Sequence, residues 1–266
     1  MIMVAFAPNL YFMYREWEPL DRFAAAAEDG FTRAELCYLD DLDVAEVKRA
    51  AADAGIEILS FNYPPGEVVP GKSRGLSALP GREADFRELF AQGLDWARAL
   101  GTKMAMCSLA GLRPDGVALA DCEAVLIENL RWAAPQLAKA GVILLVEPHC
   151  SKDFPGYVLD RLGQVRRIVD AVASPRVRML MDTYHSQRME GNLTGNFLSH
   201  QSVIAHVQVG NAPDRHEPDI GEVNHRNFFR ALDEAGYRGL VVGEYFPAHK
   251  TRDGFGWIDK WGIARA

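Results

Sequence analysis

Four largely apolar segments in the second half of the chain each end in a side chain that offers an oxygen atom. Glu147 follows the run Val-Ile-Leu-Leu-Val and precedes Pro148, and three later runs end at Asp182, Gln208 and Glu244. A short apolar run is typical of a strand buried on both faces, and a proline cannot donate to the hydrogen-bond ladder that would continue it. The sequence therefore predicts three carboxylates and one amide at the carboxyl ends of core strands.

If these strand ends meet at one edge of a sheet, the three carboxylates would repel one another unless a cation neutralised their charge. Carboxylate and amide oxygens suit a hard divalent ion, Mg²⁺ or Mn²⁺, better than zinc or copper. Taken alone, a glutamate after an apolar strand is usually the first solvated residue of a loop. The coincidence of four such ends favours a shared metal site over that simpler explanation.

Other polar residues follow these strand ends and are candidate substrate ligands. His185, Asp153 and Arg215 each lie within seven residues of one of them. A guanidinium could clamp a carboxylate or hydroxyl groups, because it donates in a planar fork. The alternatives are an ordinary loop histidine for His185 and a turn cap for Asp153.

The segment Asn62–Gly81 is rich in Pro and Gly and contains Lys72 and Arg74. At about twenty residues it exceeds an ordinary connection, which predicts a functional loop or lid. Its two basic residues are further candidates for substrate binding, and the alternative is that they are solvated loop charges.

The elements that must position these residues alternate regularly, and all but one of the predicted helices end at a glycine before the next strand begins. Eight strands are predicted, at Met3–Ala7, Ala34–Tyr38, Ile56–Phe61, Lys103–Cys107, Val142–Glu147, Val177–Asp182, Val203–Gln208 and Leu240–Glu244. Helices are predicted at Glu18–Asp29, Val44–Ala54, Arg82–Leu100, Ala120–Ala140, Arg161–Val172 and Asn227–Ala235. This order predicts an α/β fold, a (β/α)₈ TIM barrel formed as one domain by residues 1–266. The alternative is an open doubly wound sheet, although no GxGxxG motif follows the first strand.

Composition narrows the class of protein. The 266 residues are 48% hydrophobic and 24% charged, and the net charge of −7 argues against nucleic-acid or anionic-membrane partners. The four cysteines have no CxxC spacing, which predicts reduced thiols in a cytoplasmic protein. No apolar run reaches membrane-spanning length, and the apolar start lacks the features of a secretory signal.

Several short motifs together resemble the hydroxypyruvate isomerase family, which is a branch of the xylose isomerase-like barrels that also include ketose 3-epimerases. The matching segments are Pro8–Leu10, Phe61–Asn62, Leu79–Glu83, Asp182–Gly191, His206–Val209, Arg215–Pro218, Gly221–Asn224, Gly243–Tyr245 and Gly254–Trp257. The resemblance runs over nearly the whole chain. It departs from the family at Cys37–Asp41, at His149-Cys150 and at Val209-Gly210, and these changes line the predicted mouth.

The resemblance implies a Mg²⁺ or Mn²⁺ ion bound by Glu147, Asp182, Gln208 and Glu244. It also implies that Glu147 and Glu244 are the acid/base pair, and that His185 and Arg215 hold substrate oxygens. Glutamine at position 208 is typical of hydroxypyruvate isomerases, whereas the sugar epimerases usually carry histidine there.

The expected activity is therefore an isomerase that moves a proton through an enediolate, converting hydroxypyruvate to tartronate semialdehyde. The alternative is a ketose 3-epimerase or a related sugar isomerase, and more remote alternatives are an abasic-site endonuclease or a non-catalytic binding protein. The expected partner is a small-molecule substrate. Family analogy suggests a homo-oligomer, and the tail tryptophans Trp257 and Trp261 are compatible either with such a contact or with packing of the last helix.

Overall fold

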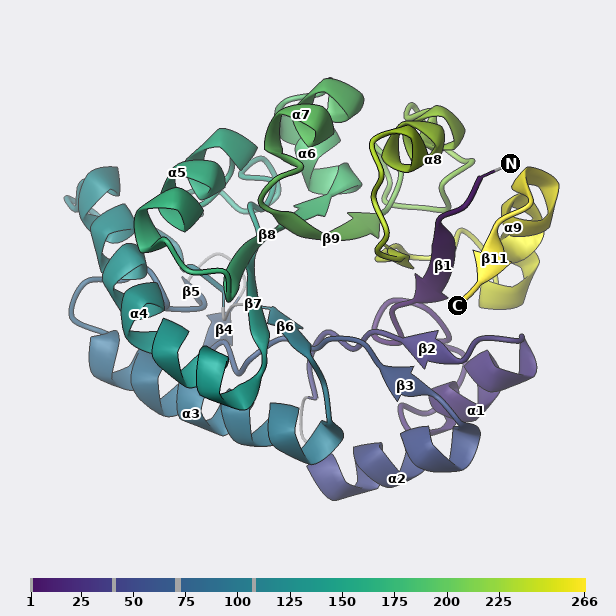
Figure 1. Ribbon diagram of the computed structural model, residues 1–266, viewed down its shortest axis with the longest axis horizontal. Coiled ribbons are helices and arrows are strands. Elements are labelled where there is room, and N and C mark those ends of the chain that lie inside the picture. Colours follow the sequence, from purple (N-terminus) through teal and green to yellow (C-terminus); the bar gives the residue numbers. More distant parts are fainter. Residues whose placement is uncertain (1, 40–41, 70–72, 107–108) are drawn as a thin grey trace.

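Eight short strands arranged in a ring form the centre of the computed structural model, which describes residues 2–39, 42–69, 73–106 and 109–266 (Figure 1). The strands of the ring are β1 (Ala5–Pro8), β2 (Arg33–Ala34), β3 (Glu57–Ile58), β6 (Met104–Met106), β7 (Ile143–Val146), β8 (Val177–Asp182), β9 (Ile204–Val209) and β10 (Val241–Gly243). Parallel pairing runs in the order β1-β10-β9-β8-β7-β6, and β2 pairs with β3. A parallel bridge between Asn9 and Glu35 joins β1 to β2. The predicted (β/α)₈ barrel is confirmed.

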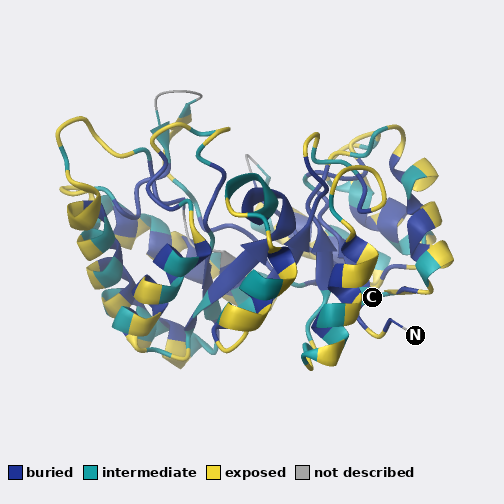
Figure 2. Cartoon of the chain, turned by 90° about the horizontal axis from the view of Figure 1, so that it is seen from above, coloured by how far each residue is buried: buried dark blue, intermediate teal, exposed yellow. Residues whose placement is uncertain are grey.

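Helices surround the ring, with exposed residues on their outer faces and buried residues toward the centre (Figures 1 and 2). They are α1 (Asp21–Glu28), α2 (Val44–Ala54), α3 (Glu83–Leu100), α4 (Leu119–Ala140), α5 (Leu162–Val172), α6 (Thr183–Met189), α7 (Leu193–His200), α8 (His225–Glu234), a 3₁₀ turn η1 (Thr251–Phe255) and α9 (Gly256–Trp261). Gly55, Gly101 and Gly141 end α2, α3 and α4 in the left-handed conformation, with φ of 69°, 74° and 71°. Among the described residues, no helix is both long and apolar enough to cross a bilayer.

Some elements differ from the sequence-based prediction. The second strand pairs at Arg33–Ala34, at the start of the predicted Ala34–Tyr38, because the backbone beyond it bonds mainly to loops. The predicted loop Asn62–Gly81 contains an antiparallel hairpin of β4 (Val68–Val69) and β5 (Ser73–Arg74). Helices α6 and α7 were not predicted, and β11 (Ala264–Arg265) adds a strand beside β1. Trp257, in the tail, is buried and packs edge-on against Phe6.

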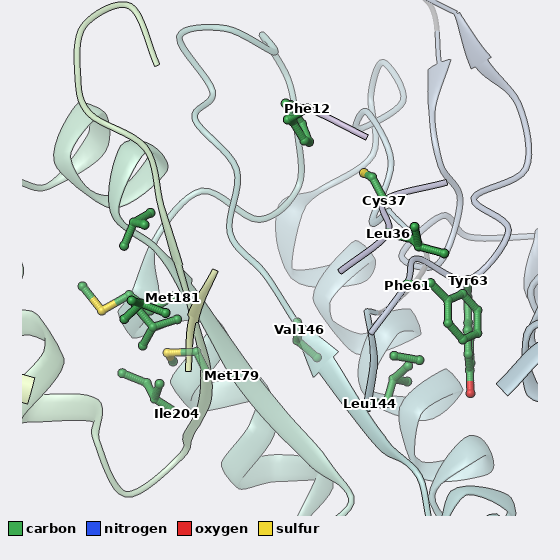
Figure 3. Close-up of a cluster of buried hydrophobic side chains, with 14 of the residues drawn as sticks. Phe12, Leu36, Cys37, Phe61, Tyr63, Leu144, Val146, Met179, Met181 and Ile204 are labelled. Carbon is green, nitrogen blue, oxygen red and sulfur yellow. The ribbon is translucent and has the colours of Figure 1, made fainter. Parts of the chain in front are cut away.

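The main hydrophobic core lies between the strands and the surrounding helices. Leu144 and Val146 of β7 and Met179 and Met181 of β8 belong to it, and Figure 3 shows these side chains in the buried cluster. All four are at most 1% exposed. Burial on this face accounts for the apolar residue at every second position of these strands.

The opposite face of the same strands points into the barrel. Leu145 and Leu180 are fully buried there and form a separate small cluster. Side chains alternate between the two faces of a strand. Glu147 and Asp182, two residues further on, therefore point to the same interior and lie one layer closer to the strand ends.

Candidate active site

Four side chains converge where the strands β7, β8 and β10 end. Glu147 follows β7, Asp182 is the last residue of β8 and Glu244 follows β10, and His185 lies in the first turn of α6. Each offers one ligand atom, and these atoms all lie within 4.8 Å of one another. The Oδ1 atom of Asp182 also accepts the N–H of Tyr184 at 2.6 Å, so the carboxylate that faces the cluster caps α6 as well.

Arg215 is the cation of this cluster. Its Nη2 atom lies 2.8 Å from Oδ2 of Asp182 and 2.5 Å from Oε2 of Glu244, and its Nε atom donates to the Glu244 carbonyl at 3.0 Å. Burial opposes its charge, but Glu244 and Asp182 outweigh that effect and raise the pKa of Arg215. The residue has a φ of +58°, in the left-handed region where a side chain is strained. A strained backbone beside two buried carboxylates is typical of a functional site.

The carboxyl group of Glu244 is held at a raised pKa. Burial is the main cause, the nearby charges of Glu147 and Asp182 add to it, and Arg215 opposes it. Glu244 thus takes up a proton more readily than an ordinary glutamate, which is the property required of a side chain that gives and receives protons.

His185 presents an N–H to the carboxylates. Its Nδ1 atom accepts the backbone N–H of Cys150 at 3.1 Å, so the proton of the neutral ring lies on Nε2. That Nε2 atom is 3.8 Å from Oε1 of Glu147 and 3.8 Å from Oδ2 of Asp182. Burial, followed by the charge of Arg215, lowers the pKa of His185 well below its ordinary value. The ring is therefore a neutral donor that faces the centre of the cluster.

His149 links Glu147 to the hairpin. Its ring stacks on His185 with centroids 4.7 Å apart, and its Nε2 atom lies 3.0 Å from Oε2 of Glu147. Its Nδ1 atom lies 3.4 Å from Nη2 of Arg74. A guanidinium can only donate, so Nδ1 accepts and Nε2 donates its proton to Glu147. His149, which the sequence analysis marks as a departure from the family, thus lies directly against Glu147, one of the predicted catalytic residues.

Arg74 belongs to β5 and is held between rings. Its guanidinium carbon lies 3.5 Å from the centroid of the Phe154 ring, and its Nε atom is buried without a hydrogen-bond partner among the described residues. The Arg74 guanidinium forms no ion pair with any carboxylate of the described residues. Gly75 fixes the hairpin next to it, because a Cβ there would lie 2.2 Å from the Leu109 carbonyl oxygen. Arg74 is therefore a preorganised cation with no anionic partner in the part of the chain that the structure describes.

Two other predicted substrate ligands, Asp153 and Lys72, are not placed in this cluster by the structure. Asp153 accepts the Tyr184 hydroxyl at 2.8 Å and pairs with Arg188 at 3.2 Å, and it is not part of the metal-competent cluster. Burial, with Asp153 as the next cause, raises the pKa of Tyr184 to about 12. Lys72 lies outside the described residues, so its predicted role stays a prediction.

Gln208 lies beside Asp182 on the neighbouring strand, since the two are register partners. Its Nε2 atom donates to Oε1 of Glu35, a fully buried residue that sequence reasoning missed. The available signal was a single acidic residue inside the otherwise apolar run Ala34-Glu35-Leu36-Cys37.

The residues present fit a divalent cation. The Oε1 atom of Glu147 is buried and has no hydrogen-bond partner within the described part of the chain. Three carboxylates and one guanidinium give a formal charge of −2, which a divalent cation would balance. Among the described His, Cys, Asp and Glu side chains, the cluster adds His185 to the three predicted carboxylate ligands. Gln208, the fourth predicted ligand, is the register partner of Asp182.

Comparison with known proteins gives a consistent group of relatives. Residues 23–261 match the family model for the xylose isomerase-like TIM barrel. The chain is 40% identical to a 2-oxo-tetronate isomerase of Cupriavidus necator, over 96% of this chain and 98% of the relative. It is 37% identical to a hydroxypyruvate isomerase of Escherichia coli, over 97% of this chain and 100% of the relative.

Solved structures support the same fold. A Brucella melitensis protein named as an AP endonuclease of family 2 superposes with a TM-score of 0.92 at 37% identity, covering 97% of this chain and 99% of its own. A D-psicose 3-epimerase of Clostridium cellulolyticum H10 superposes with a TM-score of 0.74 at 18% identity, covering 91% and 85%. At that identity the second likeness concerns the fold alone.

Proposed function

This chain is an isomerase that belongs to the xylose isomerase-like TIM barrel family, and we propose that its substrate is a 2-oxo-3-hydroxy acid of three or four carbons. Hydroxypyruvate is the first candidate, with tartronate semialdehyde as its product. One observation carries the proposal: Glu147 and Glu244, whose side chains are only 11% and 7% exposed, present ligand atoms within 4.8 Å of each other. Next to them, Arg74 contacts His149 and has no carboxylate partner among the described residues.

The names of the relatives support this substrate class. Hydroxypyruvate and 2-oxo-tetronate share a carboxylate, a carbonyl at C2 and a hydroxyl at C3, and differ only beyond C3. Arg74 supports a carboxylate, because its guanidinium is oriented by Phe154 and His149 and has no acidic partner among the described side chains. A half-buried, oriented arginine that has no anionic partner among the described residues favours an anionic ligand.

The proton transfer is assigned to Glu147 and Glu244. One of them removes the proton from C3. The electron pair of that C–H bond forms the C2–C3 double bond of the enediolate, and the carbonyl electron pair moves onto the C2 oxygen. A glutamate then returns a proton to C2, while the hydroxyl proton moves from the C3 oxygen to the C2 oxygen. The N–H of His149 orients Glu147, and the raised pKa of Glu244 suits it to carry a proton. His185 and Arg215 donate to the substrate oxygens.

Glu147, Asp182, Gln208 and Glu244 would hold the cation, either Mg²⁺ or Mn²⁺. When bound, it would supply positive charge that stabilises the enediolate. Arg215 neutralises part of the excess negative charge of the carboxylates and so keeps Asp182 and Glu244 in place.

The catalytic assignment is tested by NMR in D₂O with hydroxypyruvate as substrate. The wild-type protein is expected to place solvent deuterium on the reacting carbons, and Glu244→Gln and Glu147→Gln to lose this exchange while remaining folded. Glu57→Gln is the matched control, because Glu57 pairs with Arg33 on the surface. An active Glu244→Gln protein would remove Glu244 from the mechanism.

The carboxylate assignment is tested with Arg74→Met. The KM for hydroxypyruvate is expected to rise by at least about tenfold, since a charge-assisted hydrogen bond contributes about 1.5–3 kcal/mol. Exchange of dihydroxyacetone, a neutral analogue in which CH₂OH replaces the carboxylate, should change little. Equal losses for both compounds would contradict a carboxylate contact. Assays with D-psicose and with a DNA duplex that contains an abasic site serve as tests of the epimerase and nuclease alternatives.

A further inference from the structure

A buried carboxylate, Glu35, lies inside the barrel at the end of β2 and takes no part in the proposed proton transfer. Its Oε1 atom accepts from Nδ2 of Asn9 at 2.7 Å and from Nε2 of Gln208. Its Oε2 atom accepts from Oγ of Ser60 at 2.6 Å and from Nε2 of His206 at 2.7 Å. Glu35 is 0% exposed, so these four donors replace water around its charge.

The four donors come from three different parts of the ring. Asn9 follows β1, Ser60 follows β3, and His206 and Gln208 both lie on β9. Side chains two residues apart point to the same face of a strand, so His206 lies one layer below Gln208. Glu35 therefore connects strands on opposite sides of the barrel, and it contacts one of the proposed cation ligands, Gln208.

This arrangement determines which end of the Gln208 amide faces Glu35. An ionised carboxylate only accepts hydrogen bonds, so the NH₂ group of Gln208 must point toward Glu35. The opposite orientation would place the amide oxygen against the carboxylate oxygen. The other amide that donates to Oε1 of Glu35 belongs to Asn9. Its orientation is fixed independently of Gln208, because the backbone N–H of Tyr11 donates to Oδ1 of Asn9 at 3.0 Å.

We propose that Glu35 is a positioning residue, which holds the Gln208 amide so that its oxygen is available to a divalent cation. This role rests on the proposed function, because it assigns Gln208 to the ligand set. Partners that orient a ligand from behind commonly change metal affinity about ten- to hundredfold when they are removed. The competing view is that the buried hydrogen bonds only stabilise the barrel.

The test is a Mn²⁺ titration of the metal-free protein by calorimetry, with thermal unfolding in parallel. Glu35→Met removes every acceptor and is expected to weaken Mn²⁺ binding about ten- to hundredfold. Ser60→Ala is the matched control, because it removes a donor to the same carboxylate and leaves the Gln208 bond intact. It should lower the unfolding temperature and change the Mn²⁺ affinity less than about threefold.

A double-mutant cycle identifies the route of the effect. In a Gln208→Leu background, Glu35→Met should produce no further loss of Mn²⁺ affinity, because there is no amide left to orient. A full additional loss would mean that Glu35 acts through general destabilisation or charge, and would overturn the proposal.

A measurement on the wild-type protein covers the case in which Glu35→Met does not fold. The side-chain carbonyl carbon of Gln208, identified by its absence in Gln208→Leu, should shift in the ¹³C spectrum when Mg²⁺ is added. An unchanged resonance in a protein that binds Mg²⁺ would overturn the positioning role alone. A wild-type protein that binds neither Mg²⁺ nor Mn²⁺ would instead overturn the metal dependence in the proposed function.

Discussion

Arg215→Met removes the only charge that pairs with Asp182 and Glu244 among the described residues, while keeping a side chain of similar length. Two charge-assisted hydrogen bonds, at 2.8 and 2.5 Å, and one bond to a carbonyl at 3.0 Å are lost together. The two carboxylates stay buried, with exposed side-chain fractions of 0% and 7%. Breaking a buried pair in this way typically costs about 3–5 kcal/mol of unfolding free energy.

The assay is urea unfolding at 25 °C and pH 7, with the protein kept metal-free by EDTA or saturated with Mn²⁺. In EDTA the variant is expected to be about 3–5 kcal/mol less stable than the wild type. With Mn²⁺ the deficit should shrink, because a cation between the carboxylates replaces part of the missing charge and binds the variant more tightly. Arg33→Met is the control, since its surface pair with Glu57 contributes about 1 kcal/mol or less.

The deficit should also depend on pH. Loss of Arg215 raises the pKa of Glu244 further, and a carboxyl group with a raised folded pKa contributes stability that is lost as the pH rises. The difference between variant and wild type should therefore grow between pH 5 and pH 8. A metal-free deficit no larger than that of Arg33→Met would refute the charge argument. A deficit that is the same with and without Mn²⁺ would refute the placement of a cation among these carboxylates.

Three further predictions concern other parts of the barrel. Burial lowers the pKa of His225 from 6.5 to about 4, so the unfolded chain takes up the proton first as the pH falls. In urea unfolding, the free energy of unfolding of the wild type should therefore fall by about 3 kcal/mol more than that of His225→Gln when the pH is lowered from 7 to 4. Leu180→Ala should lower the free energy of unfolding by about 2–5 kcal/mol, because it leaves a cavity in the apolar layer below the site. A smaller decrease in the same assay would contradict tight packing of that layer. Gly75→Ala should displace Arg74 and raise the KM for hydroxypyruvate, because the added Cβ meets the Leu109 backbone; an unchanged KM would contradict that anchoring.

The carboxylates of the site could be predicted from the sequence for a local reason. Each lies directly after an apolar run, and parallel strands that surround one axis bring their carboxyl ends to one rim. Glu147, Asp182 and Glu244 are therefore located by strand assignment alone. Helix ends at Gly55, Gly101 and Gly141 were equally local, because the left-handed cap depends on the glycine itself.

Glu35 and Arg74 depend on contacts that the sequence does not display. Glu35 meets His206 and Gln208 across separations of 171 and 173 residues, and only closure of the ring brings them together. The inferred role of Arg74 depends on the hairpin that orients its side chain and on the absence of an ion-paired carboxylate among the described residues. The link from His149 to Glu147 was also missed, although the sequence marked His149 as a departure from the family.

Inside the barrel, Leu145 and Leu180 form an apolar layer below the site, and His206, which is the register partner of Leu180, is bonded to Glu35. A polar molecule cannot cross such a layer without losing its hydration. Substrate and product must therefore use one entrance, at the rim where the strands end. Each product molecule has to leave through that entrance before the next substrate can bind, so product accumulation should slow the forward reaction by simple competition for the free enzyme.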